Sequence, residues 1–192
     1  MKKMAVFASG AGSNAQKIID HFSDKSKKAS VALIVCNKPN AGVLQIAAKD
    51  GISTLIIEKE RFFRGDAYLP ELKSYQIDFI VLAGFLWKIP QALINAYPRR
   101  IINIHPALLP KYGGKGMYGD VVHEAVLNAA EPESGITIHY VDEHYDHGDI
   151  IFQAKCTVTE SDDAQSLSTK IHALEHKYYP EVIERVLNKS SL

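Results

Sequence analysis

The sequence has few cysteines, no long apolar run and no excess of either charge. Cys36 and Cys156 are too few for a disulfide framework or a cysteine-based zinc site. No apolar stretch approaches the roughly 20 residues that span a bilayer, and the run Met4–Ala8 is too short for the core of a signal peptide. The 22 basic and 22 acidic residues cancel, so no overall field favours nucleic acid or an anionic membrane. We therefore expect a cytoplasmic protein without nucleic-acid or membrane partners.

What is present is an alternation of strand-like and helix-like segments. The chain of 192 residues, 46% of them hydrophobic, fits a single domain over residues 1–192. Apolar β-branched runs predict buried strands at Met4–Ser9, Val31–Cys36, Thr54–Ile57, Asp78–Gly84 and Arg100–Ile104. Helical spacing predicts helices at Ser13–Phe22, Gly42–Lys49, Asp66–Tyr75 and Pro90–Ala96. This order predicts an α/β fold with a Rossmann-like open, mostly parallel β-sheet and helices on both faces.

The second half of the chain has a different pattern. Gly135–Glu143 alternates apolar and polar residues, and Asp149–Val158 follows after a short turn. These segments predict added strands of the same sheet, and an antiparallel edge is one arrangement open to them. From Asp163, apolar residues at three- and four-residue spacing predict a long amphipathic helix, with a kink expected at Pro180.

A glycine-rich turn separates the first strand from the first helix. "FASGAGSNAQKII" places Gly12, Ser13 and Asn14 at that turn. Glycine lets the backbone approach a ligand closely, and a helix start offers free N–H groups, so the turn suits a phosphate. Ser13 or Asn14 as a plain helix N-cap is the alternative. A dinucleotide is disfavoured, because the second strand ends with Asn37 and Lys38 where a ribose-binding carboxylate is expected.

Two polar side chains end the fifth strand. Asn103 and His105 follow an apolar run and are separated by one residue, so an extended backbone points both to the same side. Ligands of open parallel sheets bind beyond the carboxyl ends of the strands. An amide and an imidazole there can donate hydrogen bonds to a developing oxyanion. The alternative is a polar turn before Pro106.

The segment "HYVDEHYDHGDII" is rich in histidine and carboxylate. His139, Asp142, His144, Asp146 and His147 lie within nine residues. This composition suggests a metal site, but the spacing does not match H-E-x-x-H, and we expect no catalytic metal. A carboxylate from this segment near His105 would orient the imidazole ring and favour its protonated form.

The motifs together resemble a known family. "NIHPALLPKYGG", followed some forty residues later by "DEHYDHGDII", is similar to formyltransferases that use 10-formyltetrahydrofolate. "FASGAGSNAQKII" and "EHKYYPEVI" narrow the resemblance to the phosphoribosylglycinamide formyltransferases of purine biosynthesis. The resemblance covers essentially the whole chain. It implies formyl transfer from 10-formyltetrahydrofolate, as co-substrate, to the amine of glycinamide ribonucleotide.

The resemblance also implies roles for individual residues. The family's catalytic residues fall on Asn103, His105 and Asp146. Asn103 and a protonated His105 are expected to stabilise the oxyanion, and Asp146 is expected to keep His105 charged and to assist proton transfer. The residues that bind the substrate phosphate and ribonucleotide fall on Gly12, Ser13, Asn14, His172 and Glu175. The folate-binding residues fall on Leu86, Trp87, Lys88, Ile89, Asn103, Asp142, Glu143, His144, Tyr145 and Asp146.

The chain departs from the family's pattern at three places, one of which is His172, where some relatives have a lysine or a glutamine. Gly65 stands where some relatives have a cofactor-contacting arginine, and Arg64 is displaced from that position by one residue. "GGKGMYG" replaces the "PGLH" that many relatives carry after "LLPKY".

The resemblance also divides the chain and leaves alternatives open. About residues 1–100 would form a nucleotide- and phosphate-binding half and about 101–192 a folate-binding and catalytic half, in a monomer or homodimer with small-molecule substrates. The alternatives are a formyltetrahydrofolate hydrolase, a folate-dependent formyltransferase with another acceptor, or a non-catalytic folate or nucleotide binder.

Overall fold

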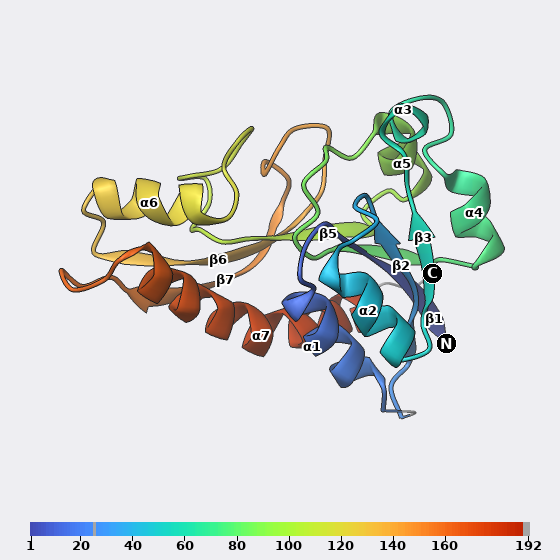
Figure 1. Cartoon of the computed structure of the whole chain (residues 1–192), viewed down its shortest axis with the longest axis horizontal. Coiled ribbons are helices and arrows are strands. Elements are labelled where there is room, and N and C mark those ends of the chain that lie inside the picture. The colour runs from blue at the N-terminus through green and yellow to red at the C-terminus, as the bar shows by residue number, and fades with distance from the viewer. Residues whose placement is uncertain (25, 190–192) are drawn as a thin grey trace.

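A seven-stranded sheet organises the molecule, and helices pack on both of its faces (Figure 1). The computed structural model describes residues 1–24 and 26–189. The strands are β1 (Lys2–Ala8), β2 (Ala29–Cys36), β3 (Ser53–Ile56), β4 (Phe79–Leu82), β5 (Ile101–His105), β6 (Glu133–Tyr140) and β7 (Ile150–Thr157). Their order in the sheet is β3-β2-β1-β4-β5-β6-β7. The pairs from β3 to β5 are parallel, whereas β6 pairs antiparallel with both β5 and β7.

The helices form two groups. They are α1 (Ser13–Phe22), α2 (Gly42–Lys49), α3 (Lys59–Phe62), α4 (Leu69–Ser74), α5 (Gln91–Ala96), α6 (Asp120–Asn128) and α7 (Ala164–Lys189). Figure 1 shows α1, α2 and α7 together, and α3, α4 and α5 grouped apart from them. Among residues 1–24 and 26–189, no helix combines the length and the apolar character that crossing a membrane requires.

The pleat of the strands divides the core into two clusters. In β1, Met4 and Val6 point to the cluster that contains α1, α2 and α7. Ala5 and Phe7 point to the opposite cluster, which contains α3, α4 and α5. Side chains alternate between the faces of a strand, so both faces of a central strand must be apolar, as they are here. The predicted α/β fold, with a mostly parallel sheet covered on both faces, is confirmed.

The predicted elements agree closely with those observed. Each of the five parallel strands begins and ends within two residues of its predicted bounds, and α1 and α2 have the predicted bounds. The added strands and their antiparallel arrangement are also confirmed. The short helices α3 and α6 were not predicted; the four residues of α3 are too few to define a helical period. Helix α7 continues through Pro180.

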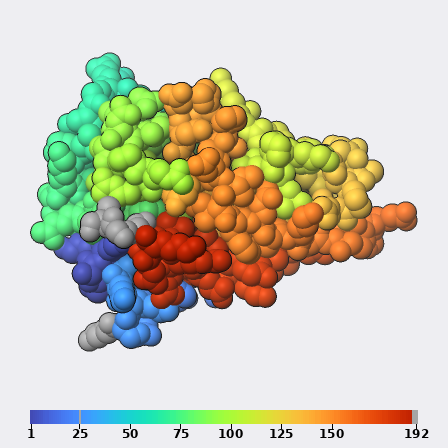
Figure 2. All heavy atoms as spheres, turned by 180° about the vertical axis from the view of Figure 1, so that it is seen from behind, coloured from blue at the N-terminus to red at the C-terminus, as the bar shows by residue number. Residues whose placement is uncertain are grey.

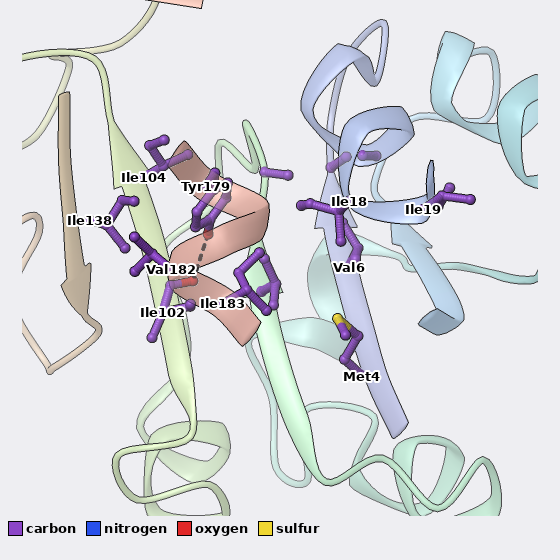
Figure 3. Packing of buried hydrophobic residues seen from close by; sticks show 14 of the residues in the cluster. Met4, Val6, Ile18, Ile19, Ile102, Ile104, Ile138, Tyr179, Val182 and Ile183 are labelled. Carbon is purple, nitrogen blue, oxygen red and sulfur yellow. Dashed lines mark hydrogen bonds between the residues drawn. The ribbon is translucent and has the colours of Figure 1, made fainter. Parts of the chain in front are cut away.

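Tyr179 fastens the long helix α7 to the centre of the sheet. Its side chain is fully buried, and its hydroxyl donates to the Leu82 carbonyl at 2.8 Å and lies 3.4 Å from the Ile102 carbonyl. Figure 3 shows the ring among Ile102, Ile104 and Ile138. The two carbonyls belong to β4 and β5, so this contact holds α7 against both strands. Strand β5 is the one that ends with Asn103 and His105.

Replacing Tyr179 by Phe removes this hydrogen bond and keeps the ring. We expect Tyr179→Phe to lower the free energy of unfolding by about 1 kcal/mol, because the loss leaves buried carbonyls with one donor fewer. Thermal unfolding would show this as a fall in Tm of about 2–4 °C. The matched control is Tyr178→Phe on the same helix, where the ring is only partly buried and a shift within about 0.5 kcal/mol is expected. An equal loss of unfolding free energy in the two variants would show that the Tyr179 hydrogen bond does not stabilise the packing of α7 on the sheet.

Candidate active site

The antiparallel pairing of β5 with β6 creates the polar centre of the molecule. Asn103 lies opposite His139, and His105 lies opposite Thr137. Ile102, Ile104 and their partners on β6 face the cluster with α7, so the four polar residues share the other face of the sheet. Asn103 Nδ2 lies 3.1 Å from His139 Nε2.

His139 orients the Asn103 amide. Its Nδ1 lies 2.8 Å from the Tyr140 carbonyl, which can only accept, so Nδ1 carries the ring proton. In the neutral ring Nε2 then accepts the hydrogen bond from Asn103 Nδ2. His139 is only 2% exposed. The side chain therefore fixes both the position of the amide and the direction of its donors.

Asp146 reaches this centre from the turn between β6 and β7. Its Oδ1 lies 3.4 Å from Asn103 Nδ2, and its Oδ2 lies 3.5 Å from His105 Nδ1. The Gly114 N–H donates to Oδ2 at 3.0 Å. Asp146 adopts a left-handed backbone conformation with φ of 54°. At Gly148 a Cβ would lie 1.9 Å from the Tyr140 carbonyl oxygen, so the turn closes against the end of β6 only with glycine there.

The charge states of His105 and Asp146 follow from burial and from their partners. Burial lowers the pKa of His105, which is 3% exposed, although the Asp146 carboxylate opposes this shift. Burial alone would raise the pKa of Asp146, but its hydrogen bonds, among them the one from the Gly114 N–H, and the nearby imidazole rings together lower it. Asp146 is therefore ionised and the neutral form of His105 is favoured. The lowered pKa of His105 does not support the expectation that Asp146 keeps it protonated, because desolvation outweighs the attraction of a carboxylate 3.5 Å away.

The tautomer of His105 is set by the loop that follows β5. His105 Nε2 lies 2.7 Å from the Tyr112 carbonyl oxygen, and this short contact requires the proton on Nε2. A donor N–H is thus prepared at the carboxyl end of β5, beside the Asn103 amide.

The glycine turn forms a second part of the site with the middle of α7. Gly12 has φ of 86° and precedes α1, whose first N–H groups receive no side-chain cap. The alternative of a plain N-cap is therefore excluded for Ser13 and Asn14. Asn14 Nδ2 instead donates to Glu175 Oε2 at 2.8 Å, and His172 Nδ1 lies 2.8 Å from the same oxygen. Glu175 is 4% exposed, so this carboxylate is buried between its two donors.

This second part of the site contains a charged donor and several polar atoms without partners. The hydrogen bond to Glu175 raises the pKa of His172, which favours its cationic form. Asn14 Oδ1, His123 Nδ1 and His176 Nε2 are buried and have no hydrogen-bond partner among residues 1–24 and 26–189. Buried polar atoms in folded proteins are nearly always hydrogen-bonded, so these three atoms can pair with a ligand or with water. A free helix start, a cation and these atoms together suit a phosphorylated, hydroxyl-bearing ligand.

The two predicted folate-binding segments lie next to each other. Lys88 Nζ lies 5.9 Å from the centre of the Tyr145 ring, and Leu86 and Tyr145 are 41% and 40% exposed. Figure 2 shows the orange surface near residue 150 beside the light-green surface near residue 100. A 2.7 Å ion pair between Arg99 and Asp149, which follow the two folate-binding segments in the sequence, joins these two surfaces. Trp87 packs against Phe62, Phe63 and Phe85, with ring centres 5.7–6.2 Å apart. These segments present exposed apolar and aromatic groups next to the buried polar centre.

One predicted folate-binding residue does not expose its side chain. Ile89 is 4% exposed and belongs to the core cluster with α3, α4 and α5, so its side chain is not available to a ligand. Arg64 is 79% exposed in its side chain and pairs with Glu60 at 3.6 Å. The other members of the second segment, Glu143 and His144, are exposed.

Several residues of the centre were not assigned from the sequence. His139 was noticed only as one of several histidines, although its place in the alternating run "ITIHYV" puts it on the face away from Ile136 and Ile138. The Tyr112 carbonyl and the Gly114 N–H are backbone groups of an irregular loop, which leave no side-chain signal. His123 lies on the unpredicted helix α6.

Similarity to known proteins agrees with this arrangement. The family model described as "Formyl transferase" matches residues 2–183. A chloroplastic phosphoribosylglycinamide formyltransferase of Arabidopsis thaliana is 44% identical over 187 residues, which cover 95% of this chain and 64% of that protein. The phosphoribosylglycinamide formyltransferase of Bacillus subtilis is 39% identical, with 97% of this chain and 95% of that protein covered.

A solved structure extends the similarity to three dimensions. The crystal structure of phosphoribosylglycinamide formyltransferase from Bacillus halodurans superposes with a TM-score of 0.88 at 38% identity. The alignment covers 98% of this chain and 96% of that one. Since the family model spans nearly all of the sequence and the fold is shared over its whole length, the chain belongs to the formyl transferase family.

Proposed function

We propose that this protein transfers the formyl group of 10-formyltetrahydrofolate to the amine of glycinamide ribonucleotide, giving formylglycinamide ribonucleotide and tetrahydrofolate. This is a step of purine biosynthesis. The observation that carries the proposal is the position of the Asn103–His105–Asp146 centre, with the polar pocket of Asn14 and Glu175 as a second part of the site. The relatives described above bear the name of this activity.

The binding of the two substrates follows from the chemistry of each part. The phosphate would bind at the N–H groups of Gly12, Ser13 and Asn14, and Glu175 would accept hydrogen bonds from ribose hydroxyls. The folate would lie along residues 86–89 and 142–146, where Lys88 is close to Tyr145. The reacting amine and the formyl carbon would then meet at Asn103 and His105.

The reaction requires stabilisation of negative charge and removal of a proton. When the amine attacks the formyl carbon, its oxygen becomes an oxyanion, which would accept hydrogen bonds from Asn103 Nδ2 and from the His105 Nε2–H. In the structure the His105 N–H donates to the Tyr112 carbonyl, so the oxyanion would replace that carbonyl as its acceptor. Asn103 Nδ2 contacts His139 Nε2 at 3.1 Å and Asp146 Oδ1 at 3.4 Å, and the oxyanion would replace Asp146 at the longer of these two contacts. The ionised Asp146 would accept the proton of the attacking amine, directly or through water, and the proton would return to the departing folate nitrogen. Neutral His105 is sufficient for this role.

The decisive experiment measures folate release with and without glycinamide ribonucleotide. Tetrahydrofolate formed only when that amine is present supports the proposal. Release without the amine would identify a hydrolase, and release with a different amine would identify another acceptor. The absence of release in all cases would indicate a non-catalytic binder. Monomer or homodimer state, a cytoplasmic location and the division into two halves stay predictions, although Asn14 and Glu175 already join the two halves in one pocket.

Removing either the oxyanion donor, Asn103, or the base, Asp146, should lower the rate of formyl transfer in the same assay. We expect Asn103→Ala to lower kcat by about 10²–10³, the usual effect of losing one oxyanion donor. Asp146→Asn should also lower kcat strongly, because the amide cannot accept the proton. Asn95→Ala, an exposed asparagine on α5, is the matched control and should retain normal turnover. Near-normal kcat in Asn103→Ala or Asp146→Asn would remove that residue from the mechanism.

The phosphate site can be tested through Gly12. A Cβ there would lie 2.8 Å from Val43 Cβ, and the positive φ disfavours any other residue, so Gly12→Ala must distort the turn. We expect the wild type to prefer the phosphorylated substrate to its dephosphorylated analogue by up to about 30-fold in KM, the range expected for an anion at a helix start. In Gly12→Ala this preference should shrink while KM for the dephosphorylated analogue changes little. A preserved preference would place the phosphate elsewhere.

The two site histidines should titrate in opposite directions from the ordinary value of 6.5. NMR of the ring C–H signals, assigned with His105→Gln and His172→Gln, should give a midpoint below 6.5 for His105 and above 6.5 for His172. The contribution of His105 to stability is therefore present above pH 6.5 and lost as pH falls through its lowered pKa. The contribution of His172 is complete below pH 6.5 and lost as pH rises through its raised pKa. A midpoint at or above 6.5 for His105 would contradict the lowered pKa and would support the protonated ring as the oxyanion donor.

A further inference from the structure

The turn that carries Asp146 has a second cluster of polar side chains on its outer side. One ligand atom each from Asp142, His144 and His147 lies within 4.8 Å of the others. We propose that these three residues bind one divalent transition-metal ion, with Zn²⁺ as the ion, on the side of the turn away from Asn103 and His105. Two of them, Asp142 and His144, also belong to the predicted folate-binding segment.

The geometry of the cluster is close to that of a metal site. In tetrahedral zinc sites with bonds of about 2.0–2.1 Å, neighbouring ligand atoms are about 3.4 Å apart. Asp142 Oδ2 and His147 Nδ1 are already 3.4 Å apart. The rings of His144 and His147 are 5.6 Å apart, centre to centre. Only rotation of exposed side chains is needed to close the remaining distance.

The backbone holds the carboxylate in place for this role. Asp142 Oδ1 accepts a hydrogen bond from the His144 N–H at 2.8 Å, which leaves Oδ2 directed toward His147. A ligating carboxylate is usually fixed by a hydrogen bond of this kind. The side chains of Asp142 and His147 are 38% and 76% exposed, so an ion can reach them from solvent.

The types of the three ligands select the class of ion. Imidazole nitrogen favours Zn²⁺ and its neighbours in the transition series, whereas Mg²⁺ and Ca²⁺ prefer oxygen ligands. Two histidines and one carboxylate also leave a coordination position for water. Mg²⁺ is therefore the appropriate negative probe.

The inner and outer sides of the turn have separate contacts. Asp146 points inward, to Asn103, His105 and the Gly114 N–H. His144 and His147 contact each other and Asp142 on the other side of the turn. An ion on the outer side would join the two ends of the turn without occupying the catalytic centre. Because the ion binds the folded turn better than the unfolded chain, its binding should stabilise the protein.

The test is a titration of the untagged, full-length protein with Zn²⁺ by calorimetry and with Co²⁺ by visible absorption. We expect one ion per chain, and a Kd that rises by about tenfold or more in His144→Ala and in His147→Ala, since even loss of a residue behind a ligand weakens binding 10–100-fold. The control is His21→Ala, which removes a partly buried histidine that also pairs with a carboxylate, Glu184 at 2.7 Å. The His21→Ala variant should bind Zn²⁺ and Co²⁺ with the affinity of the wild type.

Thermal unfolding adds a second measurement on the same proteins. Zn²⁺ should raise the Tm of the wild type and of His21→Ala, and should not raise the Tm of the His144→Ala/His147→Ala double variant. Absence of Zn²⁺ binding in the wild type would overturn the proposal, as would equal binding of Mg²⁺. Binding that both histidine variants retain would also overturn it, because the ion would then lie elsewhere. None of these readouts depends on formyl transfer, so failure of this proposal is distinct from failure of the proposed function.

Discussion

The antiparallel pairing of β5 with β6 is the constraint on which the site depends. If the strand next to β5 ran parallel to it, the chain would not run back along β5 from its carboxyl end. The reversed strand sets His139 opposite Asn103 and then turns at Asp142–Gly148, which brings Asp146 back over His105. The pairing register thus determines both contacts, and a slip of β6 by one residue would turn Thr137 and His139 toward the apolar cluster with α7.

Burial determines the chemistry of the centre as much as the identity of its residues. His105 and Asp146 form a pair that in water would favour an imidazolium beside a carboxylate. In the protein, desolvation of His105 outweighs the attraction, while Asp146 keeps its charge because several donors surround it. A neutral donor and a charged acceptor side by side are what attack by an amine requires, since the acceptor must remain free to take a proton.

The sequence predicted the elements that have a clear apolar period and the side chains that follow strand ends. Asn103 and His105 were recognised because polar residues rarely end a buried strand, and Asp146 was assigned by family resemblance. The charge state of His105 could not be predicted, because it depends on how completely loops 40 residues away in the sequence exclude water. The Gly114 N–H was missed because a backbone donor in an irregular loop leaves no trace in side-chain patterns.

In the proposed mechanism, the Tyr112 carbonyl would let the centre distinguish the transition state from the substrate. In the structure it accepts the His105 Nε2–H at 2.7 Å, so that donor is satisfied before any ligand arrives. A neutral formyl oxygen would be a similar acceptor and would gain little by displacing it. An oxyanion forms a hydrogen bond roughly twice as strong, so the exchange becomes favourable only as negative charge develops. The binding energy released by that exchange would therefore lower the barrier rather than tighten substrate binding.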